Sequence, residues 1–336
     1  MRVLVARQDN IGEVLLAGPA VRAVARRAEE VVLLCGPRGR AAADLLPGVD
    51  RVLEWRAPWI DPDHVPVERA AVDRLVRDLR GFDRALILTS FHQSPLPLAL
   101  LLRLAGTPWI GGISEDYSGS LLDLRHRPDT DLPEPLRMLA LAEDAGFPSP
   151  ADTRLRVRGP LPDTGHLTGG PGYVVVHPGT SVPARAWPPG RCAEAVRLLD
   201  AAGHRVAVTG HGDEKELTAL VAGEAGLDLG GRTTLPELAS VLAGACAVVA
   251  GNTGPAHLAA AVGTPVVSLF APTVPAARWA PFGVPLALLG DQRAPCKDSR
   301  ARDCPVDGHP CLSSVTADEV AAAVEIVASV EEVPTS

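Results

Sequence analysis

Apolar residues in the first half of the chain form short unbroken runs, separated by stretches in which they recur at helical spacing. Residues 3–6 and 31–35 are unbroken runs of strand length, which is typical of strands buried on both faces. Between them, the apolar positions predict an amphipathic helix over 13–27. The same reading predicts further strands over 52–54 and 84–89, and helices over 38–46, 68–80 and 95–105.

The second half repeats this alternation of strands and helices. Strands are predicted over 173–177, 205–209, 227–229, 247–250 and 266–270. Helices are predicted over 190–202, 213–225, 235–243, 255–262 and 316–330, the last beginning with Thr-Ala-Asp-Glu, a capping pattern. Alternating strands and helices indicate an α/β fold with doubly wound parallel sheets.

Residues 148–172 separate the two halves and are rich in Pro and Gly, which marks them as a linker, with a short strand expected at 154–157. At 336 residues the chain is too long for one ordinary core. We therefore expect two Rossmann-like domains, 1–160 and 171–336, with their parallel sheets facing across a cleft. The final helix is a candidate to pack back on the N-terminal domain.

Composition narrows the possible partners. Hydrophobic residues make up 46% and charged residues 21%, as in an ordinary globular protein. A net charge of −8 argues against non-specific nucleic-acid binding, although an amide-lined pocket could still bind an anionic nucleotide. The longest apolar stretches, 95–102 and 255–271, are broken by Pro, His or Gly, and the first residues do not resemble a signal peptide. The expected protein is soluble and intracellular.

Ligands of open α/β sheets bind beyond the carboxyl ends of the strands. The loops that follow predicted strands are therefore the places to search for chemistry. These loops are 7–13, 177–188, 209–213 and 251–257.

The loop after the strand at 247–250 has features of an anion site. Small residues and Gly254 allow close backbone approach, and Pro255 suits the first turn of a helix whose amides point outward. Thr253 adds a hydroxyl donor. An ordinary capped turn is an equal alternative on these grounds, and His257, flanked by apolar residues, is more typical of a packed histidine.

The run from Gly231 to Pro281, which contains GNTGPAHLAAA, resembles the C-terminal signature of glycosyltransferase family 9, the ADP-heptose:lipopolysaccharide heptosyltransferase-like enzymes. The resemblance implies a GT-B fold and a nucleotide-sugar diphosphate held by this loop. Asn252 stands where the family commonly has Asp, so the shape and an acceptor oxygen are kept without the charge. The implied donor-binding residues of this loop are Asn252, Thr253, Gly254, Pro255 and His257.

The opening segment VARQDNIGEVLLAGPAVRAV resembles the family's first strand, loop and helix. The family's motif there is usually Ile/Met-Gly-Asp, and its Asp is the proposed catalytic base. Gly12 matches the glycine of the motif and is a candidate acceptor-side residue. Glu13 occupies the position of the Asp and is one methylene longer. The resemblance favours Glu13 as base. The alternative is a first-turn acid that complements the helix dipole.

The segment HPGTSVPARAWPPGRCAEAV resembles the first loop of the family's second domain. The resemblance implies that Arg185, ahead of Trp-Pro, contacts the donor phosphates, with hydroxyls from Thr180 and Ser181. The run Thr209–Glu214, with Gly210 and Asp213, matches the family's Gly-rich loop after the next strand, and the resemblance implies that it lines the nucleoside pocket. The alternatives are a solvated arginine, and a plain turn in which Asp213 caps a helix.

The segment 40–150 matches the family weakly, and there His92 and residues 114–117 are candidate acceptor-side residues or plain surface loops. Near the end, Cys296, Cys304 and Cys311 resemble spaced cysteines frequent in the family. Their intervals are not those of a zinc ribbon. Packed thiols are the favoured interpretation over a metal site that includes His309.

The resemblance implies an inverting, metal-independent transfer of a sugar, heptose by analogy, from an ADP-sugar to a hydroxyl of a glycan or metabolite. No cofactor beyond the nucleotide-sugar substrate is expected, and the expected protein is a cytoplasmic monomer with at most peripheral contact at the inner face of the membrane. The alternatives are an inactive nucleotide-sugar-binding scaffold, a transferase using another nucleotide sugar, and an epimerase. A dehydrogenase is disfavoured because the first strand lacks a G-x-G-x-x-G turn.

Overall fold

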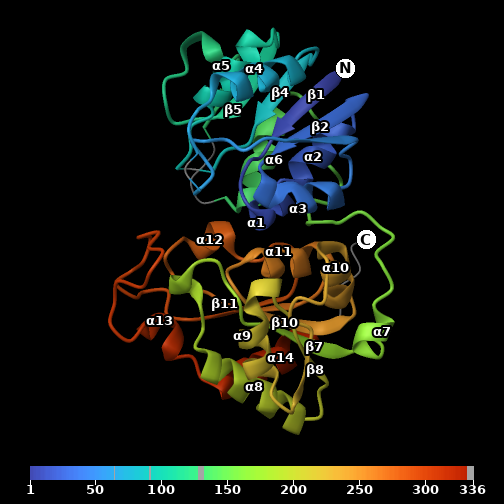
Figure 1. The fold of residues 1–336 in the computed structure, drawn as a ribbon, viewed down its shortest axis with the longest axis vertical. Helices are drawn as coiled ribbons and strands as arrows, with labels where there is room; N and C mark the ends of the chain where they lie inside the picture. The colour runs from blue at the N-terminus through green and yellow to red at the C-terminus, as the bar shows by residue number, and fades with distance from the viewer. Residues whose placement is uncertain (64, 91, 128–131, 331–336) are drawn as a thin grey trace. The chain divides into compact units, whose positions relative to one another are not determined.

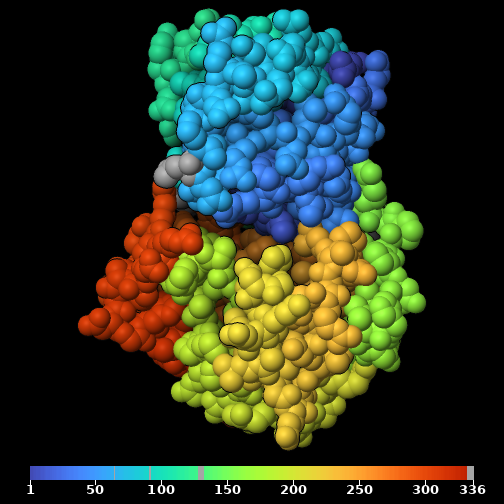
Figure 2. All heavy atoms as spheres, viewed as in Figure 1, coloured from blue at the N-terminus to red at the C-terminus, as the bar shows by residue number. Residues whose placement is uncertain are grey.

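A computed structural model of the chain describes residues 1–63, 65–90, 92–127 and 132–330. The chain divides into two compact units, Met1–Arg158 and Gly159–Ser336, coloured blue to green and green to red (Figure 1, Figure 2).

The described residues of the first unit form a six-stranded parallel sheet in the order β3-β2-β1-β4-β5-β6. Its strands are β1 (Arg2–Ala6), β2 (Glu30–Cys35), β3 (Arg51–Glu54), β4 (Arg84–Ile87), β5 (Trp109–Ile113) and β6 (Leu124–His126). Its helices are α1 (Ile11–Leu16), α2 (Gly18–Ala25), η1 (Pro37–Gly39), α3 (Arg40–Leu45), α4 (Arg69–Asp78), α5 (Leu96–Leu104), η2 (Gly119–Leu121) and α6 (Glu134–Asp144).

The described residues of the second unit also form a six-stranded parallel sheet, in the order β12-β11-β10-β7-β8-β9. Its strands are β7 (Tyr173–His177), β8 (Val206–Val208), β9 (Gly226–Asp228), β10 (Ala245–Gly251), β11 (Val266–Leu269) and β12 (Leu286–Leu289). Its helices are α7 (Gly165–Thr168), η3 (Pro183–Arg185), α8 (Pro189–Ala201), η4 (Gly212–Glu214), α9 (Lys215–Ala222), α10 (Leu235–Ala243), α11 (Gly254–Ala261), α12 (Ala276–Trp279), α13 (Pro310–Ser313) and α14 (Ala317–Ala328).

The two sheets have the same topology. Counted from the start of each unit, both read 3-2-1-4-5-6, the doubly wound order. The order reverses between β1 and β4 in the first unit and between β7 and β10 in the second. The predicted fold class, two Rossmann-like domains with parallel sheets, is confirmed. The reversal points identify the loops at which each unit can bind a ligand.

The predicted helix over 13–27 is two helices, α1 and α2, separated at Ala17. Pro19 lies in the first turn of α2 and has no N–H to donate to the preceding turn, while its ring crowds the carbonyl of Leu15. Ala17 instead donates its N–H to Val14 at 3.1 Å. Because of this break, α1 is a separate short helix directly after the loop of β1.

The structure contains elements that the apolar pattern did not predict, namely β5, β6, α6 and β12. In β5, Gly111 and Gly112 interrupt the apolar run. A Cβ on Gly111 would lie 2.8 Å from the ring of Trp109, and one on Gly112 would lie 3.2 Å from Pro95. The two glycines allow neighbouring side chains to pack closely. Because they have no apolar side chain, the apolar pattern predicts this strand only weakly.

The predicted strand at 154–157 is absent, and this stretch has no regular structure. It belongs to the first unit, where Arg22 donates to the backbone carbonyl of Arg154 at 2.6 Å and Arg158 N–H donates to Leu45 at 2.7 Å. Leu155 is buried. The first part of the Pro/Gly-rich segment therefore packs on the first unit through contacts that its composition does not encode.

The terminal helix α14 begins as its sequence predicts. Thr316 Oγ1 accepts from the N–H of Glu319 at 3.2 Å, and Glu319 Oε2 accepts from the N–H of Thr316 at 2.7 Å, a reciprocal cap. Val320 and Val324 on this helix belong to the core of the second unit. Through this face α14 packs on the sheet of its own unit. The expectation that the final helix packs back on the N-terminal domain stays a prediction.

Among the helices that the described residues form, none is both long and apolar enough to cross a bilayer.

Candidate active site

The first candidate site lies at the reversal point of the second sheet, where the loops after β7 and β10 meet. Arg185 ends the short helix η3 in the first of these loops, and its Nη1 donates to the backbone carbonyl of Asn252, in the second, at 3.4 Å. A small pocket at this point is lined by Val176, His177, Pro178, Gly179, Arg185, Trp187, Cys192, Val249, Gly251 and Leu269. Arg185 and Asn252, which the sequence singled out in these two loops, are thus brought together.

The start of α11 has the geometry predicted for an anion site. Strand β10 ends at Gly251, the helix begins at Gly254, and Pro255 lies in its first turn. Thr253 has extended backbone and makes no side-chain cap. Its buried Oγ1 has no hydrogen-bond partner among the described residues. Since Pro255 has no N–H and Ala256 donates to Thr253 at 3.2 Å, the helix start presents the amide of Gly254 beside an unused hydroxyl, which suits a phosphate group.

His257, one turn into α11, is 4% exposed, and its Nδ1 has no partner within the described part of the chain. Burial and, to a smaller extent, the positive charge of Arg185 lower the pKa of His257 to about 4. The imidazole is therefore neutral at pH 7. The electrostatic effect of Arg185 shows that this histidine lies within the cationic field of the site.

Thr180 and Ser181 lie in the same loop as Arg185. Thr180 Oγ1 accepts from the N–H of Val182 at 3.2 Å, which closes a local turn, and Ser181 is exposed. Asn252 is 4% exposed at the end of β10. Both loops thus contribute polar groups, although the Thr180 hydroxyl is engaged locally.

In the loop after β8, the acid that points inward is Glu214 and not Asp213, which the sequence singled out. Asp213 is exposed, and its carboxylate pairs with His211 at 2.7 Å. The next residue, Glu214, accepts from the N–H of His211 at 2.7 Å. A Cβ on Gly179 would lie 2.0 Å from the carboxylate of Glu214, and one on Gly210 would lie 3.2 Å from it. Glycine at these two positions leaves room for the side chain of Glu214. In the sequence, the spacing of Gly210 and Glu214, Gly-x-x-x-Glu, was the signal that could have identified Glu214.

His177 lies beside this carboxylate at the end of β7. Its Nδ1 is 3.0 Å from Thr209 Oγ1. Burial lowers the pKa of His177 to about 4, while the charge of Glu214 acts in the opposite direction. The neutral side chain of His177 and the carboxylate of Glu214 therefore lie together where the loops after β7 and β8 begin.

The second candidate site lies at the reversal point of the first sheet. The loop after β1 leads into α1, which places Gly12 and Glu13 in its first turn, Gly12 buried and Glu13 half-buried. Asn10 occupies the N-cap position with extended backbone. Glu13 is thus on the loop side of the sheet, where a ligand of this unit would bind.

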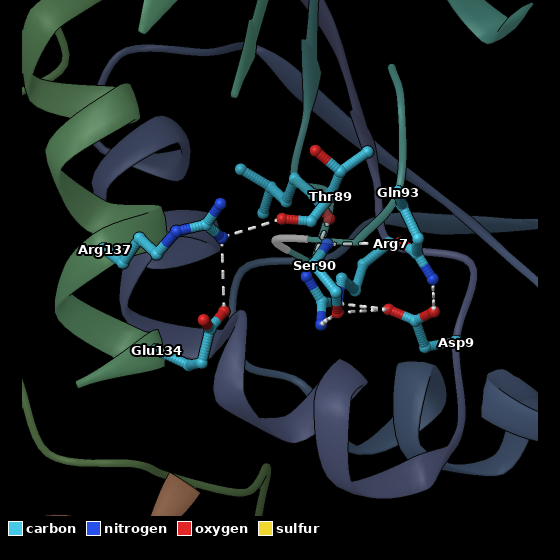
Figure 3. A network of polar contacts seen from close by, with 8 residues as sticks. Arg7, Asp9, Thr89, Ser90, Gln93, Glu134 and Arg137 are labelled. Atoms are coloured by element: carbon cyan, nitrogen blue, oxygen red, sulfur yellow. Dashed lines mark hydrogen bonds and ion pairs between the residues drawn. The ribbon is translucent and has the colours of Figure 1, made fainter. Parts of the chain in front are cut away.

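A buried polar network holds this loop (Figure 3). Arg7 is fully buried; its Nε lies 3.0 Å from Asp9 Oδ2, and its Nη1 donates to the carbonyl of Leu88 at 2.9 Å. Arg7 Nη2 donates to Ser90 Oγ at 2.7 Å, and Gln93 Nε2 donates to Asp9 Oδ1. The network ties the loop after β1 to the loop after β4 across the reversal point.

A pocket opens beside this network at the carboxyl ends of β4 and β5, with about 530 Å³ of open space. It brings together His92 and the residues at 114–116, which the sequence offered as acceptor-side candidates. Its lining comprises Ser90, His92, Gln93, Ser94, Ile113, Ser114, Glu115, Asp116 and Arg137. Tyr117 follows in the chain and is 87% exposed.

Sequence reasoning missed Arg7, Asp9, Gln93 and Arg137 as site residues. Asp9 had a signal, since it lies in the loop after a predicted strand. Arg137 had none, because α6 was not predicted. On that helix Arg137 is 4% exposed and donates to the carbonyl of Thr89 at 2.8 Å, which fixes its guanidinium against the end of β4.

The late cysteines are free thiols. Burial, together with the neighbouring thiols of Cys296 and Cys304, raises the pKa of Cys311 to about 12. At pH 7 Cys311 is therefore a protonated, weakly nucleophilic thiol in the second unit.

Comparisons with known proteins were made for sequence and for fold. The family model described as glycosyltransferase family 9 (heptosyltransferase) matches residues 72–309. Lipopolysaccharide heptosyltransferase 3 of Escherichia coli is 30% identical over 169 residues, 48% of each chain. The aligned part thus spans about half the length of this curated relative.

Two solved structures share the fold over nearly the whole chain. One is the ADP-heptose lipopolysaccharide heptosyltransferase II of E. coli, with a TM-score of 0.74, 19% identity and 98% of each chain covered. The other is an E. coli heptosyltransferase with ADP-2-deoxy-2-fluoro heptose, with a TM-score of 0.71, 20% identity, and 97% of this chain and 99% of that chain covered. At these identities the two structures establish the likeness of fold alone.

Proposed function

Since the chain belongs to glycosyltransferase family 9, the heptosyltransferases, we propose that it transfers a sugar from an ADP-sugar, with heptose as the first candidate, to a hydroxyl of a glycan or metabolite. The observation that carries the proposal is the convergence of Arg185, the unpartnered Thr253 hydroxyl and the start of α11 at one reversal point. A guanidinium, a hydroxyl and a helix amide together suit a diphosphate.

In this scheme the diphosphate of the donor occupies the start of α11. The nucleoside diphosphate is the leaving group, and its developing negative charge is stabilised by Arg185, Thr253 and the helix amide. The neutral imidazole of His257 adds one N–H donor from one turn further on. Glu214, which lies against Gly179 and Gly210, is placed to accept hydrogen bonds from ribose hydroxyls.

The acceptor hydroxyl needs a base, and Glu13 is the carboxylate that we assign to this role. Its position in the first turn of α1, on the ligand side of the first sheet, supports the assignment. Attack on the face opposite the leaving group would invert the anomeric carbon. We propose that arginine, hydroxyl and amide groups neutralise the leaving group without a metal ion.

The first test measures binding and breakdown of ADP-heptose, ADP-glucose, UDP-glucose and GDP-mannose by calorimetry and nucleotide release. We expect selective binding of ADP-heptose, with turnover lost by roughly 100-fold or more in Glu13→Gln while binding is kept. Added EDTA should leave turnover unchanged. Arg197→Ala, an exposed arginine on α8, is a control that should alter neither binding nor turnover.

Other outcomes separate the alternatives. Preference for a UDP- or GDP-sugar would keep a glycosyltransferase and discard ADP-heptose. Binding without turnover in the wild type, with any acceptor, would favour a nucleotide-sugar-binding scaffold. A donor isomerised without an acceptor would indicate an epimerase. Unchanged turnover in Glu13→Gln would remove Glu13 from the mechanism.

A further inference from the structure

The pocket at the ends of β4 and β5 has a polar lining with one apolar residue, Ile113. Hydroxyl, amide, imidazole, carboxylate and guanidinium groups all border it. Such a surface favours a ligand that offers many hydrogen-bonding groups over an apolar one. The inference drawn from this pocket rests on the proposed function, since it identifies the pocket as the acceptor site.

The pocket is connected to the loop that carries the proposed base (Figure 3). Two of its lining residues, Ser90 and Gln93, donate hydrogen bonds to the carboxylate of Asp9. Asp9 lies four residues before Glu13, in the loop between β1 and α1. A group bound against Ser90 and Gln93 therefore rests on the same rigid network that sets the start of α1.

The charges around the pocket disfavour an anion. Glu115 and Asp116 are exposed on the loop after β5. The positive charge of Arg137 is compensated by Glu134, which is fully buried and whose Oε2 lies 3.3 Å from Arg137 Nη1. Arg125 donates to the backbone carbonyl of Asp116 at 3.2 Å. The carboxylates of Glu115, Asp116 and Glu134 thus outnumber the guanidinium groups of Arg137 and Arg125 around the pocket.

We propose that this pocket binds a saccharide acceptor through its hydroxyls, and that it selects neutral or amine-bearing sugars against sugars with a phosphate or carboxylate. Carboxylate oxygens only accept hydrogen bonds, so Glu115 and Asp116 pair with hydroxyl or ammonium donors and repel a second anion. The exposed ring of Tyr117, next in the chain, offers an apolar face to a sugar ring.

The test uses three matched probes, the methyl glycosides of glucose, glucosamine and glucuronic acid, without any donor. Binding to the full chain is followed by saturation-transfer NMR at low and high salt. We expect the glucoside and the glucosaminide to bind, and the glucuronide to bind roughly two- to fivefold more weakly at low salt, as the small energies of exposed charges imply. High salt should reduce this difference.

Two double variants of equal charge change isolate the pocket. Glu115→Gln with Asp116→Asn should abolish the discrimination against the glucuronide. Asp78→Asn with Glu143→Gln, on exposed sites of α4 and α6 outside the pocket lining, should preserve it. Circular dichroism and unfolding midpoints confirm that both variants are folded.

Several results would overturn the proposal. One is tighter binding of the glucuronide, which would make Arg137 an anion site. Another is equal discrimination in both double variants, and a third is no binding of any glycoside. Donor binding is measured separately on the same protein. Failure to bind a nucleotide sugar would refute the proposed function, whereas loss of glycoside discrimination alone would refute only the acceptor assignment.

Discussion

Replacing Arg185 with Gln removes the one side-chain charge that we assign to the donor diphosphate while keeping a hydrogen-bonding group of similar length. In the structure, Arg185 is half-buried and donates to Asn252 over 3.4 Å, at the long end of the hydrogen-bond range. The free energy of unfolding should therefore fall by no more than about 1 kcal/mol.

The effect on ligand binding should be much larger. Hydrogen bonds to charged groups contribute about 1.5–3 kcal/mol, so the Kd for ADP should rise roughly 10- to 150-fold. Arg185→Lys, which keeps a point charge without the planar fork, should fall between the wild type and Arg185→Gln. The pKa of His257 should rise in Arg185→Gln, because Arg185 is one of the two causes that lower it, while burial remains.

Calorimetric titration with ADP at low and physiological salt measures the loss, and NMR titration follows the imidazole of His257. Arg197→Gln makes the same charge change at an exposed position of the same unit and should bind ADP as the wild type does. If Arg185→Gln is folded and its Kd for ADP stays within about twofold of the wild type, the assignment of Arg185 to the diphosphate is refuted.

Two further predictions concern stability. The pKa values of His177 and His257 are about 4 in the folded protein and 6.5 in the unfolded chain. The unfolded state therefore binds more protons between these pH values. The free energy of unfolding should fall as the pH drops from about 6.5 to 4, by at most about 3 kcal/mol per histidine. Urea unfolding at pH 7, 6 and 5 measures this, and a flat profile would contradict it. Asp9→Asn should cost about 3–5 kcal/mol, because it leaves the fully buried charge of Arg7 without its partner. Asp73→Asn, at an exposed i,i+4 pair, should cost under about 0.5 kcal/mol, and equal losses in the two variants would contradict the role given to the network.

The loop at the start of α11 could be predicted from the sequence because its signals are local. Gly254 and Pro255 after an apolar strand specify a turn and a helix start within a few residues. The reciprocal cap of Thr316 and Glu319 is equally local, and the structure reproduces it. Backbone geometry of this kind depends on neighbouring residues, so the residues alone were sufficient to predict it.

The selection of side chains that enter a site was less predictable. Adjacent residues Asp213 and Glu214 are both acids, and only the fold decides that Glu214 lies against Gly179, a residue on another strand's loop. The network of Arg7, Asp9 and Ser90 joins groups about eighty residues apart. Their contact exists because β1 and β4 pair in the sheet, and no periodicity in either segment expresses that pairing.

By itself, the sequence determined the fold class, the position of most strands, and the loop at the start of α11, since hydrophobic periodicity and Gly/Pro turn chemistry act over a few residues. Only the tertiary structure decided where strands with weak signals lie, such as the glycine-containing β5, and which polar side chains meet at each reversal point. The physical reason is that parallel strands joined by crossover connections bring distant loops to one edge of the sheet. The contacts made there depend on strand order, which local sequence does not encode.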